Sequence, residues 1–111
     1  MSKDDVLAVF ETALTDPGSY KSGEYLQEHV LIYAKKFLIS DRVGLIGALC
    51  EWISLKSEPL TMLSVRIAKE LNLYEMNQVI EDLRQEVSSG KVFPWYYLCY
   101  IDEALSSLQK P

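Results

Sequence analysis

Residues 41–72, DRVGLIGALCEWISLKSEPLTMLSVRIAKELN, predict two helices joined by a short turn. Asp41 belongs to the residue types that cap helix N-termini, and it directly precedes the first apolar helical stretch. Ser57 is suited to cap the second helix, and Pro59 falls in its first turn, where the missing N–H costs little. Asn72 tolerates the left-handed conformation that often ends a helix. The stretch therefore predicts an antiparallel helical hairpin.

Helical spacing of apolar residues continues on both sides of this hairpin, and the sequence has no strand-like alternation of any length. Turn-forming residues divide the flanks, Pro17-Gly18 on one side and Ser88-Ser89-Gly90 on the other. The further predicted helices span about 2–14, 22–39, 74–87 and 94–108. We therefore predict a single all-α domain of about six helices in three stacked antiparallel hairpins, at about 2–39, 41–71 and 74–109.

The chain carries an internal similarity with a period of 34 residues. Shifting the sequence by 34 places the third predicted helix on the fifth and the fourth on the sixth, with seven apolar positions in coincidence. The pairs are Leu45 with Val79, Ile46 with Ile80, Leu49 with Leu83, Ile53 with Val87, Leu63 with Tyr97, Ile67 with Ile101, and Leu71 with Leu105. Because two consecutive helices share one register, the match favours stacked hairpins over an irregular bundle.

The run VRIAKELNLYEMNQVIEDLRQEV, residues 65–87, resembles HEAT and armadillo-type repeats, whose second helix often follows the pattern V-R-x-x-A-x-x-L. Val65 and Arg66 fit this motif, while Ala68 stands one place early. The resemblance covers about residues 41–108 and implies a superhelix whose second helices line a concave face. It implies no particular function.

Residues 90–105, GKVFPWYYLCYIDEAL, follow the pattern G-K-x-F-P-x-Y-Y-x-x-x-I-x-x-A-L. This ending is similar to the C-terminus of small helical immunity proteins of bacterial polymorphic-toxin and contact-dependent growth inhibition systems. The resemblance implies an acidic cytoplasmic protein that neutralises a toxin domain by binding it, and many such toxins are nucleases with basic surfaces. Toxin contacts differ between cognate pairs, so the resemblance assigns no contact residue.

The composition narrows the class of partner. The 111 residues carry a net charge of −5, which argues against direct nucleic-acid binding because phosphate neutralisation needs clustered lysine and arginine. The negative charge is compatible with a basic protein partner. The acidity concentrates in residues 1–20 and 73–90, and we take Glu75, Asp82 and Glu86 as an acidic flank, although such carboxylates can equally form a solvated face. No apolar run reaches a membrane span, and the acidic N-terminus lacks signal-peptide features, so we expect a cytoplasmic protein without membrane contact.

The sequence offers no catalytic constellation. His29 is the single histidine, and it has no partners at metal-ligand or acid–base spacing. Cys50 and Cys99 lie in apolar helical stretches and are expected to be buried, reduced thiols. No phosphate-binding loop is present, because Gly44 and Gly47 lie inside a predicted helix. We expect no enzyme, no metal and no cofactor.

The aromatic residues near the C-terminus divide between two predicted faces. Phe93 and Tyr97 are predicted to be core, with the two rings stapled together. Another face carries the residues that we predict to bind a partner, since tyrosine and tryptophan are enriched at interface hot spots. It comprises Trp95, Tyr96, Tyr100 and Glu103, with Arg66 as the repeat counterpart of Tyr100, and Tyr25, Glu28 and Tyr33 as an extension from the second helix. The alternative is that the last helix packs its aromatics on the fourth as an end cap.

These observations predict an immunity protein that blocks a basic toxin domain, such as a nuclease, by stoichiometric occlusion. A HEAT-like adapter for a host protein is the alternative binding function. A small regulatory or enzymatic domain with a ligand pocket between helices is the alternative of a different class.

Overall fold

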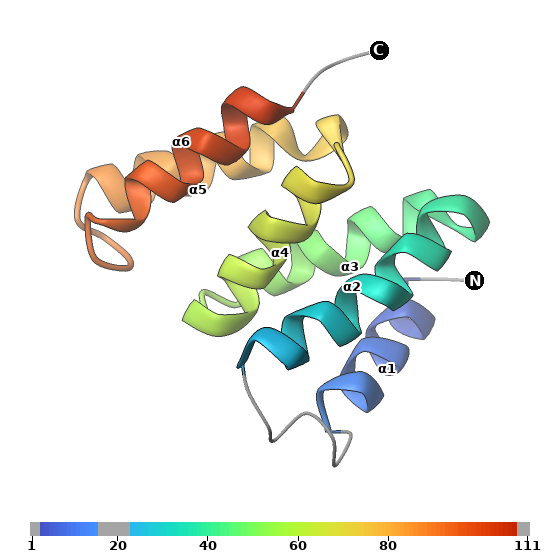
Figure 1. Ribbon diagram of the computed structural model, residues 1–111. Coiled ribbons are helices and arrows are strands. Elements are labelled where there is room, and N and C mark those ends of the chain that lie inside the picture. The colour runs from blue at the N-terminus through green and yellow to red at the C-terminus, as the bar shows by residue number, and fades with distance from the viewer. Residues whose placement is uncertain (1–2, 16–22, 109–111) are drawn as a thin grey trace. The chain divides into compact units, whose positions relative to one another are not determined.

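The computed structural model describes residues 3–15 and 23–108, and of residues 23–26 it describes the backbone. This part of the chain is α-helical, with a short 3₁₀ segment and no β-strand (Figure 1). The helices are α1 (Lys3–Leu14), α2 (Gly23–Ser40), α3 (Arg42–Ser54), α4 (Glu58–Glu70), α5 (Asn77–Ser88) and α6 (Tyr97–Ser107). The predicted all-α fold with six helices is confirmed, while the Pro17-Gly18 break lies outside the described residues.

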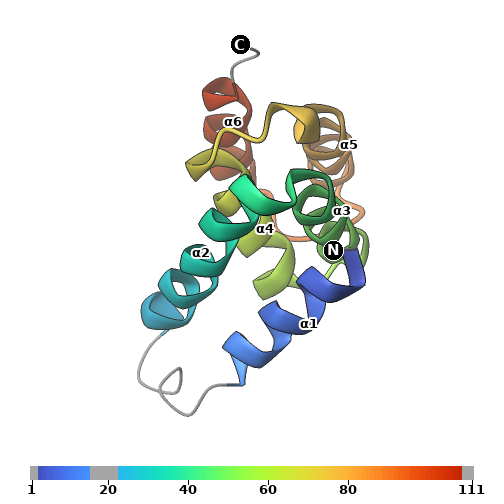
Figure 2. The same ribbon diagram turned by 90° about the vertical axis from the view of Figure 1, so that its right-hand side faces the viewer.

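The chain divides into two compact units, residues 1–48 and 49–111, and the division falls inside α3. In the first unit α1 and α2 pack side by side, as Figure 2 shows. The Phe10 ring meets the Phe37 ring edge-on, with centroids 6.0 Å apart. The two helices bury Val6, Leu7, Phe10 and Ala13 from α1 and Val30, Leu31, Ala34 and Phe37 from α2. The two helices therefore share one apolar interface.

The start of α3 is fixed by a side-chain cap. The Gly44 N–H donates to Asp41 Oδ1 at 3.0 Å, which confirms Asp41 as the capping residue. A Cβ at Gly44 would lie only 2.3 Å from Asp41 Oδ2, so a larger residue there would require the Asp41 carboxylate to shift. At Gly47 a Cβ would lie 3.4 Å from the Lys3 side chain, an ordinary contact distance. Gly44 is therefore the more tightly surrounded of these two glycines.

In the second unit α6 packs against both α4 and α5 (Figure 1). Ile67 from α4, Ile80 and Leu83 from α5, and Ile101 from α6 are fully buried. The buried Thr61 hydroxyl donates to the Trp52 carbonyl at 3.2 Å and thereby ties α4 to the end of α3. The helices after residue 49 thus share an apolar core with α6 between its two neighbours.

The 34-residue period of the sequence recurs in the backbone. Lys56 after α3 and Gly90 after α5 both adopt positive φ, 54° and 80°. The Lys56 N–H donates to the Ile53 carbonyl at 3.2 Å, and the Gly90 N–H donates to the Val87 carbonyl at 3.1 Å. Among the seven paired apolar positions, both members are buried for Leu49 with Leu83, Ile53 with Val87, and Ile67 with Ile101. The two helix ends are therefore equivalent in conformation as well as in sequence.

Two predicted helix starts are wrong by three residues. Residues Tyr74–Met76 form the 3₁₀ segment η2, so α5 begins at Asn77. Phe93 has a φ of 55°, which a right-handed helix does not allow, and the Pro94 carbonyl accepts from the Tyr97 N–H at 3.2 Å. Pro94 therefore sits in a turn ahead of α6. The predicted left-handed stop at Asn72 is confirmed, with a φ of 51°.

Candidate partner-binding surface

The loop between α5 and α6 ends in a connected series of aromatic rings. Phe93 meets Tyr97 edge-on with centroids 6.2 Å apart, and Tyr97 meets Tyr96 at 4.9 Å with a tilt of 41°. Tyr96 in turn meets Trp95 edge-on at 6.4 Å. We call Phe93, Trp95, Tyr96 and Tyr97 the aromatic cluster. Because each ring touches the next, the exposed members rest on the less exposed ones.

Exposure divides the aromatic cluster. Trp95 and Tyr96 are 77% and 58% exposed, whereas Phe93 and Tyr97 are half-buried. The predicted staple between Phe93 and Tyr97 is confirmed as a ring contact, but the prediction that both are core is wrong. The Tyr97 hydroxyl donates to Glu58 Oε1 at the start of α4, and this hydrogen bond raises the pKa of Tyr97 to about 12. The Tyr97 hydroxyl is thus tied to an exposed carboxylate.

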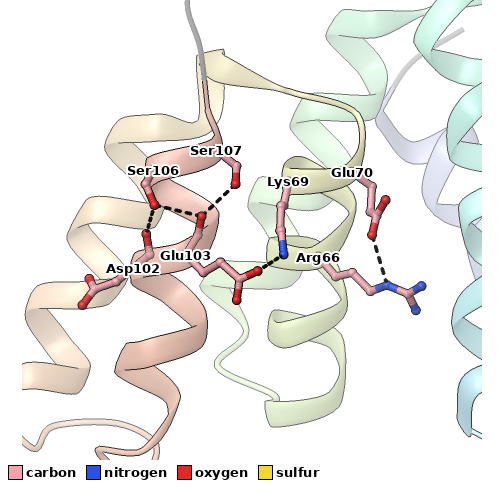
Figure 3. A network of polar contacts seen from close by, with 7 residues as sticks. All are labelled: Arg66, Lys69, Glu70, Asp102, Glu103, Ser106 and Ser107. Carbon is pink, nitrogen blue, oxygen red and sulfur yellow. Dashed lines mark hydrogen bonds and ion pairs between the residues drawn. The ribbon is translucent and has the colours of Figure 1, made fainter.

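Tyr100, Glu103 and Arg66 lie along the line where α6 packs on α4. Glu103 Oε1 lies 2.5 Å from Lys69 Nζ, so two residues 34 positions apart form an ion pair between the helices (Figure 3). Arg66 extends along its own helix, with Nε 4.0 Å from Glu70 Oε1. Tyr100 is half-buried, and burial raises the pKa of its phenol while the Arg66 guanidinium opposes the increase. Of these three predicted contact residues, Glu103 joins α6 to α4 through its ion pair with Lys69, and Tyr100 lies close enough to Arg66 of α4 to feel its charge.

The predicted acidic flank is spread over separate local contacts. Asp82 is exposed and accepts from Gln78 Nε2 at 2.9 Å, one turn away on α5. Glu86 Oε1 lies 3.3 Å from Lys56 Nζ, which joins α5 to the turn after α3. Glu75 is exposed within η2, ahead of α5. Glu75 and Asp82 are thus exposed, and Glu86 forms an ion pair within the chain.

The predicted extension on α2 lies in the first unit. Glu28 is exposed, and the half-buried Tyr33 ring stacks on His29 with centroids 5.6 Å apart. The Lys36 ammonium lies 5.2 Å from the Tyr33 ring centroid. The side chain of Tyr25 falls outside the described residues. A shallow hollow of about 360 Å³ beside Tyr33 is lined by Ala8, Val9 and Thr12, and these four side chains include no acid–base pair.

Two strongly exposed apolar side chains were missed by the sequence analysis. Ile39 near the end of α2 is 90% exposed, and Val43 in the first turn of α3 is 83% exposed. Ile32 shares the outer face of α2 with Ile39, seven residues away, and the exposed Lys35 and Lys36 lie between them. The presence of lysines beside isoleucines on one helical face was the sequence pattern that could have indicated these exposed apolar side chains.

The chain was compared with protein-family models, with curated proteins and with solved structures. None of the three comparisons finds a match. The assignment of an all-α fold therefore rests on the observed helices alone. The likeness to HEAT repeats and the likeness to immunity proteins stay predictions from the sequence.

The described residues hold no group of three or more histidine, cysteine, aspartate or glutamate side chains placed to bind a metal ion. Cys50 is half-buried, and burial raises the pKa of its thiol. Cys99 is exposed and Cys50 is only half-buried, so the prediction that both cysteines are buried is wrong. Within the same part of the chain no helix is both long and apolar enough to cross a membrane.

Proposed function

We propose that this chain is an immunity protein, which binds a toxin domain through the exposed part of the aromatic cluster and blocks it stoichiometrically. The observation that carries the proposal is the exposure of Trp95 and Tyr96, at 77% and 58%, on supporting rings. Large aromatic side chains are costly to leave in water and are the commonest binding hot spots. Burying these side chains against a partner would recover the free energy that their exposure to water costs.

The ring contacts also support tight binding for an entropic reason. Trp95 rests on Tyr96 and Tyr96 on Tyr97, so association orders fewer free rotors than isolated side chains would need. A hot-spot aromatic of this kind contributes on the order of 2 kcal/mol or more to binding. Glu75 and Asp82 would act differently, since exposed carboxylates mainly accelerate encounter with a basic partner.

The toxin part of the proposal rests on the similarity of residues 90–105 to immunity-protein C-termini. The net charge of −5 is suited to a basic partner such as a nuclease domain, and the proposed place of action is the cytoplasm. The proposed mechanism is occlusion of the toxin's active site or substrate path, with no chemistry performed by this chain.

The test begins with affinity capture from lysate of the native organism. The baits are the wild-type chain, a Trp95→Ala/Tyr96→Ala double variant, and Ile39→Ala as a matched control that removes another exposed apolar side chain. The captured partner is then expressed alone and together with each bait. We expect the partner to arrest growth alone, and the wild type and the Ile39 variant to restore it.

The outcomes separate the parts of the proposal. A captured partner that leaves growth unaffected would overturn the toxin proposal in favour of an adapter for a host protein. Rescue by the double variant equal to that by the wild type would remove Trp95 and Tyr96 from the interface. Unchanged helicity of each variant by circular dichroism is the folding control.

A further inference from the structure

We propose that Trp95, Tyr96 and Glu58 together form a receptor for one cationic side chain, an arginine or a lysine, presented by the partner. This inference rests on the proposed function in that it names the group of the partner that the aromatic cluster takes. Three features carry it: the ring faces, the carboxylate beside them, and the ion pairs elsewhere in the unit.

The ring faces supply the first part of the receptor. The planes of Trp95 and Tyr96 stand at 72° to each other in an edge-on contact, so the two rings form a corner and are not stacked face to face. Both side chains are exposed. A guanidinium or ammonium group binds over an aromatic face, and tryptophan is the strongest such partner. The corner therefore offers exposed π surface of the type that recognises cations.

Glu58 supplies a negative charge at the same place. Its carboxylate accepts the hydrogen bond of the Tyr97 hydroxyl, and the Tyr97 ring lies 4.9 Å from the Tyr96 ring. Glu58 is exposed and stands in the first turn of α4, where the helix dipole stabilises its charge. The carboxylate is thus joined to the second ring of the corner through Tyr97, which contacts both.

Ion pairs elsewhere in the unit show why a cation is the expected occupant. Glu103 is matched by Lys69, Asp102 by Arg84, and Glu86 by Lys56. Within the described residues, no lysine or arginine is paired with Glu58, whose contact is the neutral Tyr97 hydroxyl. The charge of Glu58 is therefore complementary to a cation that comes from outside the chain.

The receptor can be tested without the partner. The probes are two blocked tripeptides, Gly-Arg-Gly and Gly-citrulline-Gly, which have nearly the same shape but differ in charge. Each is titrated through the millimolar range into the full chain, and the indole N–H resonance of Trp95 is followed by NMR. Trp52 is buried, so its indole resonance serves as an internal reference for folding.

We expect a saturable shift of the Trp95 resonance with the arginine peptide and at least about fivefold weaker binding of the citrulline peptide. Glu58→Gln should weaken arginine binding about threefold and bring the two peptides closer together. Tyr96→Leu should weaken it by a similar factor, whereas Ile39→Ala should leave it unchanged. Equal binding of the two peptides, or no saturable shift, would overturn the receptor.

These outcomes are distinguishable from failure of the proposed function. Arginine-selective binding with a harmless captured partner would keep the receptor and reject the toxin proposal. Rescue that depends on Trp95 without arginine selectivity would keep the immunity function and reject the receptor.

Discussion

The turn that follows α3 and the loop that follows α5 begin with the same backbone conformation. Lys56 and Gly90, 34 residues apart, both have positive φ and both donate to the carbonyl three residues earlier. From there the two connections diverge, because α4 begins at Glu58 and α6 only at Tyr97. The position of Pro59 in the first connection is taken by Phe93 in the second, and Phe93 has a left-handed φ of 55°.

This difference shows where the repeat ends and where the candidate surface begins. Proline holds φ near −65°, which fits the first turn of a helix, so α4 starts at once. A left-handed residue at the equivalent position prevents the helix from starting and leaves residues 91–96 in a longer loop. Trp95 and Tyr96 lie in that loop. The helix ends at Lys56 and Gly90 match across the 34-residue shift. The longer loop after Gly90 has no counterpart in the first connection, and it carries the exposed aromatic rings.

The largest test of the equivalence concerns Ile67 and Ile101, which are paired by the 34-residue shift and are both fully buried. Each Ile→Ala substitution should lower the free energy of unfolding by about 2–5 kcal/mol, because it removes transfer energy and leaves a cavity. Denaturant unfolding measures both variants. Losses of similar size are expected, and a large loss at one site with almost none at the other would break the comparison.

The left-handed residues provide a sharper test with a smaller effect. A Cβ added at Gly90 would meet no other atom within 4 Å, so Gly90→Ala should cost about 1 kcal/mol through φ alone. Lys56→Gly should be more stable than Lys56→Ala by a similar amount. Both Lys56 variants lose the ion pair with Glu86, so their difference isolates the backbone. Equal stabilities of these two variants would show that the turn relaxes.

Tyr97 differs from its repeat counterpart, the buried Leu63, because Tyr97 carries an ionisable hydroxyl. The pKa of this hydroxyl should show the difference. The folded-state pKa of about 12 lies above the ordinary value near 10, so the folded state holds the phenolic proton more tightly. The stabilisation is complete below pH 10 and is lost as pH rises from 10 to 12. The measurement is the phenolate absorbance after a rapid pH jump. In Tyr97→Phe, one tyrosine fewer should ionise at high pH than in the wild type. Glu58→Gln should move the ionisation of Tyr97 toward pH 10.

The smallest effect concerns the ion pair between repeat-equivalent residues, Lys69 and Glu103. A double-mutant cycle with Lys69→Met and Glu103→Gln should give a coupling energy of about 0.2–1 kcal/mol, because both groups keep contact with water. The coupling should disappear at about 1 M salt, where screening acts within a few ångströms. Coupling that persists in high salt would mean that the α4–α6 contact is less hydrated than its exposure indicates.

Much of the fold could be predicted from local chemistry. The cap at Asp41 and the stop at Asn72 depend on single residue types whose preferences are strong, and both are confirmed. The start of α6 was placed three residues early because proline suits both a first helical turn and the turn before a helix. The φ of Phe93, which decides between them, has no signal in a sequence that shows phenylalanine at that position.

The candidate site was predictable only in part. Trp95 and Tyr96 are exposed because they lie in the loop ahead of α6, whereas the sequence analysis placed them on a face of that helix. Tyr100 and Glu103 were grouped with them by helical spacing, but α4 packs on that side of α6 and engages both. Which side a neighbouring helix covers depends on long-range packing. The partner of the Tyr97 hydroxyl, Glu58, lies 39 residues away and likewise has no local signal.

The cap at the start of α3 has a consequence for how this sequence can evolve. With the Asp41 carboxylate in its present position on the Gly44 N–H, a methyl group at position 44 would meet Asp41 Oδ2, so Gly44→Ala requires the capping carboxylate to shift. Once Asp41 has been replaced by alanine, the same substitution becomes favourable, because alanine is a better helix former than glycine. The effect of Gly44→Ala therefore depends on which residue stands at position 41, so the two positions are expected to evolve together.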